Sequence, residues 1–293
     1  MQKEIHPVKY RKAVILPKEK LFNWVSWLLK EKYKGKATEK FYKDVERLKV
    51  GEPIDYVIGF TEFLGCKIDL SKKPLIPRPE TEFWVGQVIK KNKNSVRIGR
   101  SSNSHGGEIR VLDMFAGSGC IGIAVLKNVK NCRVDFADKD KRAIEQIKLN
   151  CKLNKIKSGR YKIIRSDVFK GLDSSSLRLL RTKYDFVFAN PPYIPDYKKN
   201  SSARLRAIMR NRIQNSVLKF EPKIALFGGK DGLLYIRKFL KDAKKYLKSG
   251  GQIFMEFSSE QKRSIEKLIK KFGYKNYEFF KDQYDRWRWV QMS

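Results

Sequence analysis

The spacing of apolar residues predicts a small helical domain at the start of the chain. Apolar side chains recur at helical spacing in two segments, at Leu21, Trp24, Val25 and Leu28 and again at Phe41, Val45 and Leu48. Two short helices bury little surface alone. We therefore interpret residues 1–70 as a helical cap that packs on a larger body.

Residues 71–108 predict a connector. Pro74, Pro77 and Pro79 fall close together, and proline cannot lie inside a helix or a central strand. A helix is expected from about residue 80 to 91. A basic stretch rich in Gly, Ser and Asn follows, which is typical of a loop.

From residue 109 onward, short apolar runs alternate with helical stretches. The runs cover 109–115, 133–138, 161–167, 184–190 and 251–257, and the helical stretches lie near 120–130, 140–154, 174–182 and 231–248. This alternation predicts βαβ units and a parallel sheet. Two further strand-like runs, 274–282 and 286–292, are separated by a short turn and should pair as an antiparallel hairpin. Residues 109–293 therefore predict an α/β, Rossmann-like domain with a mostly parallel seven-stranded sheet.

The net charge indicates what the protein could associate with, which the hydrophobic pattern does not. Lys and Arg number 65 against 31 Asp and Glu, a formal net charge of +34. Such an excess favours phosphate-rich surroundings such as nucleic acid or the ribosome, although a solvated basic surface explains it equally well.

Composition excludes several classes of protein. No apolar run approaches the roughly 18 residues of a membrane span, and the N-terminus lacks the apolar core of a signal peptide, so we expect a cytoplasmic location. The four cysteines form no C-x-x-C pair, which argues against a zinc site or a disulfide framework and predicts reduced thiols. With two histidines, His6 and His105, both outside the patterned segments, imidazole catalysis is not expected.

Acidic residues follow three successive predicted strands. The first strand leads through Asp113 into Phe115, Ala116, Gly117, Ser118 and Gly119, whose glycines let a ligand approach the backbone. Asp138 ends the second strand, where an acid can accept both ribose hydroxyls of a nucleoside, and Asp167 with Val168 follows the third. Asp113 disfavours a pyrophosphate and suits a cationic ligand. A nucleoside that carries a cation suggests S-adenosylmethionine.

The fourth strand ends in Asn190, Pro191, Pro192 and Tyr193. Two prolines stiffen the chain, so the Asn190 side chain and the Pro191 carbonyl become fixed acceptors. A pair of acceptors can hold both hydrogens of an NH₂ group on an amide or a base. Tyr193 offers a flat face on which that group could stack.

These motifs together resemble an S-adenosylmethionine-dependent N-methyltransferase. Three stretches, 51–65, 75–82 and 220–233, resemble more narrowly the peptide chain release factor N5-glutamine methyltransferase family. That family methylates the glutamine side chain of a Gly-Gly-Gln motif in class I release factors. The resemblance implies a class I methyltransferase domain, residues 1–70 as substrate-recognition cap, and no metal.

The resemblance assigns roles to individual residues. Cofactor contacts are implied for Asp113, Phe115, Ala116, Gly117, Ser118, Gly119, Asp138, Asp167, Val168 and Asn190. Catalysis and substrate binding are implied for Asn190, Pro191, Pro192 and Tyr193, with Arg78 and Pro79 beside the substrate. The implied partner is a class I release factor. We expect the enzyme itself to be a monomer.

Two other functions remain open from the sequence. Residues 190–193 form a candidate substrate clamp, and the same four residues could equally hold the amino group of a base. A DNA adenine or ribosomal RNA methyltransferase is therefore the rival enzyme, and the net charge favours it. A basic nucleic-acid-binding protein with an inactive methyltransferase core is the alternative of another class. The high basic charge also favours proximity to the ribosome or RNA.

Overall fold

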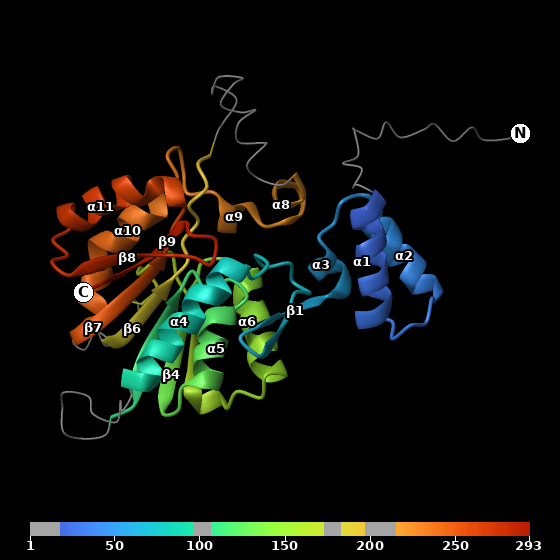
Figure 1. Cartoon of the computed structure of the whole chain (residues 1–293). Coiled ribbons are helices and arrows are strands. Elements are labelled where there is room, and N and C mark those ends of the chain that lie inside the picture. The colour runs from blue at the N-terminus through green and yellow to red at the C-terminus, as the bar shows by residue number, and fades with distance from the viewer. Residues whose placement is uncertain (1–17, 96–106, 173–182, 197–214) are drawn as a thin grey trace, which may run out of the picture. The chain divides into compact units, whose positions relative to one another are not determined.

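The computed structural model describes residues 18–95, 107–172, 183–196 and 215–293 (Figure 1). These residues fall into two compact units. Of the described residues, the smaller takes 18–59 and 215–220, and the larger takes 60–95, 107–172, 183–196 and 221–293.

The smaller unit is helical, as its apolar spacing predicts. Its helices are α1 (Lys18–Glu31), α2 (Glu39–Lys49), α3 (Ile54–Ile58) and α8 (Asn215–Phe220). Thr38 caps α2 by accepting from the amide of Phe41 at 3.3 Å. Leu28 and Leu48 are fully buried in this unit, whereas Phe22 is 73% exposed.

A β-hairpin corrects the helical interpretation of the first seventy residues. Strands β1 (Phe60–Phe63) and β2 (Cys66–Asp69) pair antiparallel. Leu64 and Gly65 both have positive φ, at 48° and 74°, as a two-residue hairpin turn requires. The turn-rich appearance of this stretch conceals period-2 burial, in which Phe63, Cys66 and Ile68 point inward.

The larger unit contains the predicted seven-stranded sheet. Its strands are β3 (Ile109–Met114), β4 (Cys132–Asp138), β5 (Tyr161–Arg165), β6 (Tyr184–Ala189), β7 (Leu247–Glu256), β8 (Tyr277–Lys281) and β9 (Trp287–Met292). They lie in the order β5-β4-β3-β6-β7-β9-β8. The first five are parallel, and β9 pairs antiparallel with both β7 and β8. The predicted fold class is confirmed.

Helices cover both faces of this sheet. They are α4 (Pro79–Ser95), α5 (Cys120–Asn128), α6 (Lys141–Leu153), α10 (Leu234–Asp242) and α11 (Lys262–Lys271). The same unit also contains the short helix α9 (Lys223–Leu226) and 3-10 turns at Ser158–Arg160, Ala243–Tyr246 and Ser259–Gln261. Pro79 occupies the first position of α4, where its missing N–H costs nothing. The helix expected over 231–248 is shorter than predicted, because β7 begins at Leu247 and Gly250 adopts a left-handed φ of 75°. The helix expected over 174–182 lies outside the described residues.

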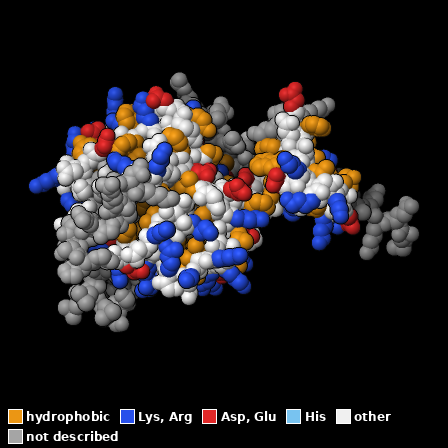
Figure 2. All heavy atoms as spheres, turned by 60° about the horizontal axis from the view of Figure 1, so that its bottom comes forward, with side chains coloured by type: hydrophobic (Ala, Val, Ile, Leu, Met, Phe, Trp, Pro, Cys, Tyr) orange, Lys and Arg blue, Asp and Glu red, His pale blue; other side chains and the backbone are white. Residues whose placement is uncertain are grey.

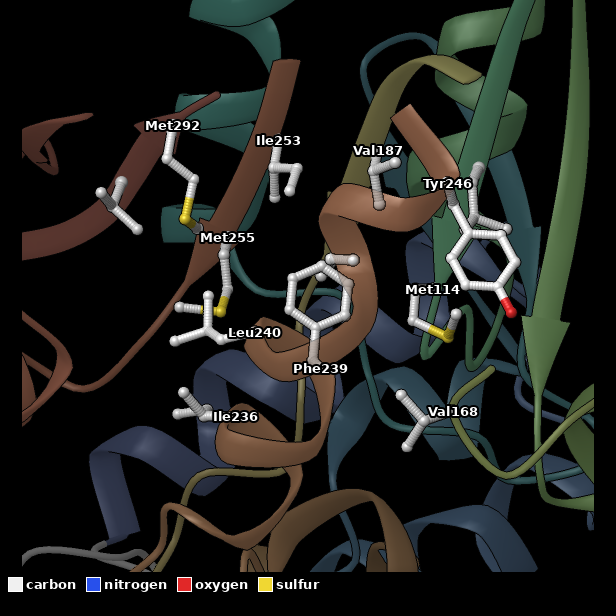
Figure 3. Packing of buried hydrophobic residues seen from close by; sticks show 14 of the residues in the cluster. Met114, Val168, Val187, Ile236, Phe239, Leu240, Tyr246, Ile253, Met255 and Met292 are labelled. Carbon is white, nitrogen blue, oxygen red and sulfur yellow. The ribbon is translucent and has the colours of Figure 1, made fainter. Parts of the chain in front are cut away.

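Alternate side chains along the strands point to opposite faces of the sheet and pack against different helices. Val111 of β3 and Phe186 of β6 lie beside Val88 of α4 and Val125 of α5. The alternate residues Leu112 and Val187 belong to a cluster with α10 and α11 instead. Figure 3 shows Phe239 and Leu240 of α10 among Val187, Ile253 and Met255 of the strands. The core thus holds the carboxyl ends of the central strands rigidly in place.

The surface reflects the composition. Figure 2 shows Lys and Arg side chains spread widely over the visible face, with fewer Asp and Glu among them. No helix in the described part of the chain combines the length and the apolar character that a membrane crossing needs.

Candidate active site

Strand register brings the predicted site residues to one edge of the sheet. Met114 pairs with Ala137 on one side and with Ala189 on the other. Ala137 pairs with Ile164, and Ala189 pairs with Met255. The residues that follow these positions lie in one row at the carboxyl edge, where open α/β sheets bind ligands.

A cleft of about 990 Å³, partly open to solvent, lies along this edge. Of the predicted site residues, it is lined by Arg78, Phe115, Ala116, Gly117, Ser118, Asp138, Asp167, Val168, Asn190 and Pro192. The structure therefore brings both the expected cofactor positions and part of the expected substrate clamp into one cavity. Asp113, Gly119, Pro79, Pro191 and Tyr193 are not among its lining residues.

The loop after β3 has a backbone that only a few residue types tolerate. Gly117 and Gly119 have φ of 55° and 79°, and Phe115 adopts 62° despite its side chain. Gly119 is the N-cap of α5, and a Cβ there would meet the Ile147 side chain at 3.1 Å. The glycines thus permit a tight turn that exposes the loop backbone to the cleft.

Asp113 lies beneath this loop. Its carboxylate accepts from the amide of Gly122 at 2.9 Å in the first turn of α5. Burial raises the pKa of Asp113 to about 7. The side chain therefore links β3 to the first turn of α5, in a buried place that disfavours its own negative charge.

Asp138 is presented to the cleft by backbone donors. Its Oδ2 accepts from the Gly117 amide at 2.8 Å, and its Oδ1 accepts from the Asp140 amide at 2.8 Å. Burial raises the pKa of Asp138, and these amides oppose that rise. The carboxylate is fixed in orientation before any ligand arrives.

Asp167 contributes an acceptor that has no partner. Its Oδ2 pairs with Lys139 Nζ at 2.8 Å, and this contact lowers the pKa of the carboxyl. Its Oδ1 is buried and has no hydrogen-bond partner. Val168, next in the chain, has φ of 55° and lies 6% exposed in the cleft wall. A buried unpaired oxygen is costly, so this one is suited to a ligand donor.

Asn190 faces the cleft from the end of β6. Its Nδ2 donates to Thr81 Oγ1 at 3.3 Å. Tyr193 instead turns into the protein, where its hydroxyl donates to Glu256 Oε1 at 3.3 Å and burial raises its pKa. The expected stacking face of Tyr193 is therefore packed partly against the core cluster.

Glu256 is a buried acid behind the cleft that the sequence patterns above do not single out. It follows Met255 at the end of β7, is 1% exposed and accepts from Thr81, Trp84 and Tyr193. The rule that picked out Asp113, Asp138 and Asp167, an acid at a strand end, would have found it if it had been applied to the fifth strand.

The cleft also contains groups without an assigned role. Cys120 lines it, and burial raises the pKa of this thiol to about 12. All four cysteines are free and buried. Among the described residues, no group of three or more His, Cys, Asp or Glu side chains is arranged to hold a metal ion.

Comparison with known proteins identifies the family. The chain is 30% identical to a release factor glutamine methyltransferase of Flavobacterium psychrophilum, and the match covers 84% of this chain and 77% of that protein. It is 32% identical to the protein of that name from Thermodesulfovibrio yellowstonii, over 81% and 75% of the two chains. The chain belongs to the release factor glutamine methyltransferase family. It is accordingly a methyltransferase, as the sequence motifs predict.

Other comparisons agree with this family. Residues 102–214 match the methyltransferase small domain model. The solved structure of the hMettl16 catalytic domain in complex with MAT2A 3'UTR hairpin 6 covers 92% of this chain and 91% of its own, with a TM-score of 0.54 and 13% identity. That likeness shows the shared fold. The release factor glutamine methyltransferase family thus carries its chemistry here on a class I methyltransferase sheet.

Proposed function

We propose that this enzyme transfers the methyl group of S-adenosylmethionine to the side-chain nitrogen of the glutamine in a Gly-Gly-Gln motif of class I release factors. Family membership gives the reaction class. The observation that carries the assignment is the position of Asn190 in the same cleft as the glycine loop and Asp138. A release factor substrate would be met in the cytoplasm, and we propose that location for the enzyme.

The cleft fits the chemistry of S-adenosylmethionine. Asp138, held by two backbone amides, is suited to accept from ribose hydroxyls. The unpartnered Oδ1 of Asp167 is suited to accept from the adenine amine. The loop from Phe115 to Ser118 would lie against the rest of the cofactor. When bound, S-adenosylmethionine supplies a methyl group activated by a sulfonium sulfur.

Positioning is the main task of the substrate clamp. An amide nitrogen is a weak nucleophile because its lone pair is delocalised. Acceptors at Asn190 Oδ1 and the Pro191 carbonyl would bind both hydrogens of the glutamine NH₂ and aim the nitrogen at the methyl group. The nitrogen–carbon bond would form as the carbon–sulfur bond breaks, sulfur would keep the bonding pair, and the nitrogen would release one proton to solvent at the open side of the cleft.

The net charge of +34 supports one rival substrate. A nucleobase amine presents the same two hydrogens to the clamp, and a basic surface favours nucleic acid. The family relatives favour the protein substrate, and direct competition decides between the two.

The test is methyl transfer from labelled S-adenosylmethionine. Purified release factor, its isolated Gly-Gly-Gln domain, ribosomal RNA and DNA are offered separately and in competition. We expect label only on the glutamine of the two protein substrates, and we expect Asn190→Ala to lose transfer while it still binds S-adenosylhomocysteine. Label on RNA or DNA with none on the release factor would refute the proposal. Absence of transfer to all four would indicate an inactive core.

A further inference from the structure

A chain of hydrogen bonds runs from the cleft into the core beside Asn190. Asn190 Nδ2 donates to Thr81 Oγ1 at 3.3 Å, and Thr81 Oγ1 donates to Glu256 Oε2 at 2.6 Å. Thr81 and Glu256 are 2% and 1% exposed. Asn190 directly follows β6, whereas Thr81 lies in α4 and Glu256 in β7, so the arrangement exists only in the folded protein.

The direction of this chain follows from the chemistry of its members. Trp84 Nε1 also reaches Glu256 Oε2, at 2.8 Å, and an indole nitrogen can only donate. Oε2 accepts from both Trp84 and Thr81, so the single proton of the Thr81 hydroxyl points to Glu256. Burial raises the pKa of Glu256, and these donors oppose that rise. The Thr81 oxygen can then only accept from its other neighbour, which must be the NH₂ end of the Asn190 amide.

The consequence is that one of two amide orientations is selected. With Nδ2 directed at Thr81, the oxygen of Asn190 is left for the cleft. The flipped amide would set its oxygen against the Thr81 oxygen, two acceptors without a proton between them. An unmet buried acceptor of this kind shifts an equilibrium by roughly 10- to 100-fold.

We propose that Thr81, anchored by Glu256, is a positioning residue that fixes the Asn190 oxygen toward the cleft and thereby makes the enzyme select an amide over a carboxylate. This inference rests on the proposed function. A glutamine NH₂ donates to the fixed oxygen, whereas a glutamate carboxylate meets a second acceptor there. Selection between Gln and Glu side chains thus originates in α4 and β7, behind the residue that touches the substrate.

Thr81→Val tests the inference because valine keeps the shape of threonine and removes the hydroxyl. The substrates are the release factor domain with Gly-Gly-Gln and the same domain with Gly-Gly-Glu as inhibitor. The readout is the ratio of the inhibition constant for the Glu domain to KM for the Gln domain. We expect Thr81→Val to lower this ratio roughly 10-fold, because the freed Asn190 amide can turn its NH₂ to a carboxylate.

Thr81→Ser is the matched control, since it retains the hydroxyl and should retain the ratio. An unchanged ratio in Thr81→Val, or an equal loss in Thr81→Ser, would overturn the inference. Structural damage alone would weaken the binding of both substrate domains equally and leave the ratio unchanged.

A second measurement needs no substrate and so separates this inference from the proposed function. In protein labelled with ¹⁵N-asparagine, hydrogen exchange of the Asn190 side-chain NH₂ is followed by NMR, with the signal assigned by its loss in Asn190→Asp. We expect faster exchange in Thr81→Val and wild-type exchange in Thr81→Ser. Equal exchange in all three proteins would refute the role of Thr81 in orienting the Asn190 amide, even if the enzyme is active. Failure of the wild type to methylate the Gln domain would refute only the proposed function.

Discussion

Arg78 donates to Glu221 Oε1 at 2.6 Å, although the two residues are 143 positions apart in the chain. Glu221 also accepts from the amide of Ile76 through its other oxygen, at 3.2 Å. One buried carboxylate thus holds the proline-rich segment against the start of α9, and both segments line the cleft. This contact joins two of the three stretches that resemble the family, 75–82 and 220–233.

Removal of the Glu221 charge should loosen the proline-rich segment that lines the cleft. In Glu221→Gln, the Arg78 guanidinium or the Ile76 amide loses its acceptor, so we expect a loss of roughly 1–3 kcal/mol in the free energy of unfolding. Hydrogen exchange in residues 72–78 should increase. Denaturant unfolding and exchange mass spectrometry measure both. Asp231→Asn, which breaks an exposed pair with Arg237, is the control and should cost less than about 1 kcal/mol. Equal effects of both variants would contradict the structural role of Glu221.

Asp167 should recognise the adenine amine. We expect wild type to bind S-adenosylhomocysteine roughly 10-fold more tightly than the analogue whose adenine amine is replaced by oxygen, since the unpartnered Oδ1 needs a donor. Asp167→Ala should lose this preference, and Asp167→Asn, which keeps one acceptor oxygen, should keep part of it. Isothermal titration calorimetry gives the affinities. A preference that persists in Asp167→Ala would assign the adenine contact elsewhere.

Asp113 should make stability depend on pH. Its pKa rises from an ordinary 3.8 to about 7 in the folded state, because burial penalises the charge. Between these values the folded protein holds a proton that the unfolded chain has released, so this group's contribution to stability falls as pH rises from about 4 to about 7.

Asp113→Asn removes that titration and can still accept from Gly122. We therefore expect the variant to gain stability relative to wild type as pH rises, by at most about 4 kcal/mol. Thermal unfolding of both proteins across this range measures the difference. A constant difference would mean that Asp113 does not titrate in this window.

Salt should separate docking from chemistry. If the basic surface attracts an acidic partner, KM for the full-length release factor should rise steeply between about 0.05 and 0.3 M salt while kcat changes little. Steady-state kinetics at several salt concentrations measures both constants. A flat KM would show that the Lys and Arg excess is solvated surface with no part in docking.

The larger features of the fold are local enough to be predicted. Apolar runs of strand length between helical segments predict the parallel sheet, and the two closely spaced C-terminal runs predict the hairpin of β8 and β9. The β1–β2 hairpin escaped prediction because its strands are four residues each. Such short strands carry too few alternations to be distinguished from a turn-rich loop.

By itself, the sequence determined the sheet, the strand-end acids and the place of Asn190 after a strand, because burial periodicity and turn residues are local properties of the chain. Only the tertiary structure decided which side chains contact Asn190. Thr81 and Glu256 are 175 positions apart and meet because α4 packs on the sheet beside β7. Likewise, the orientation of the Asn190 amide depends on donors and acceptors from three elements, a relationship that no local pattern contains.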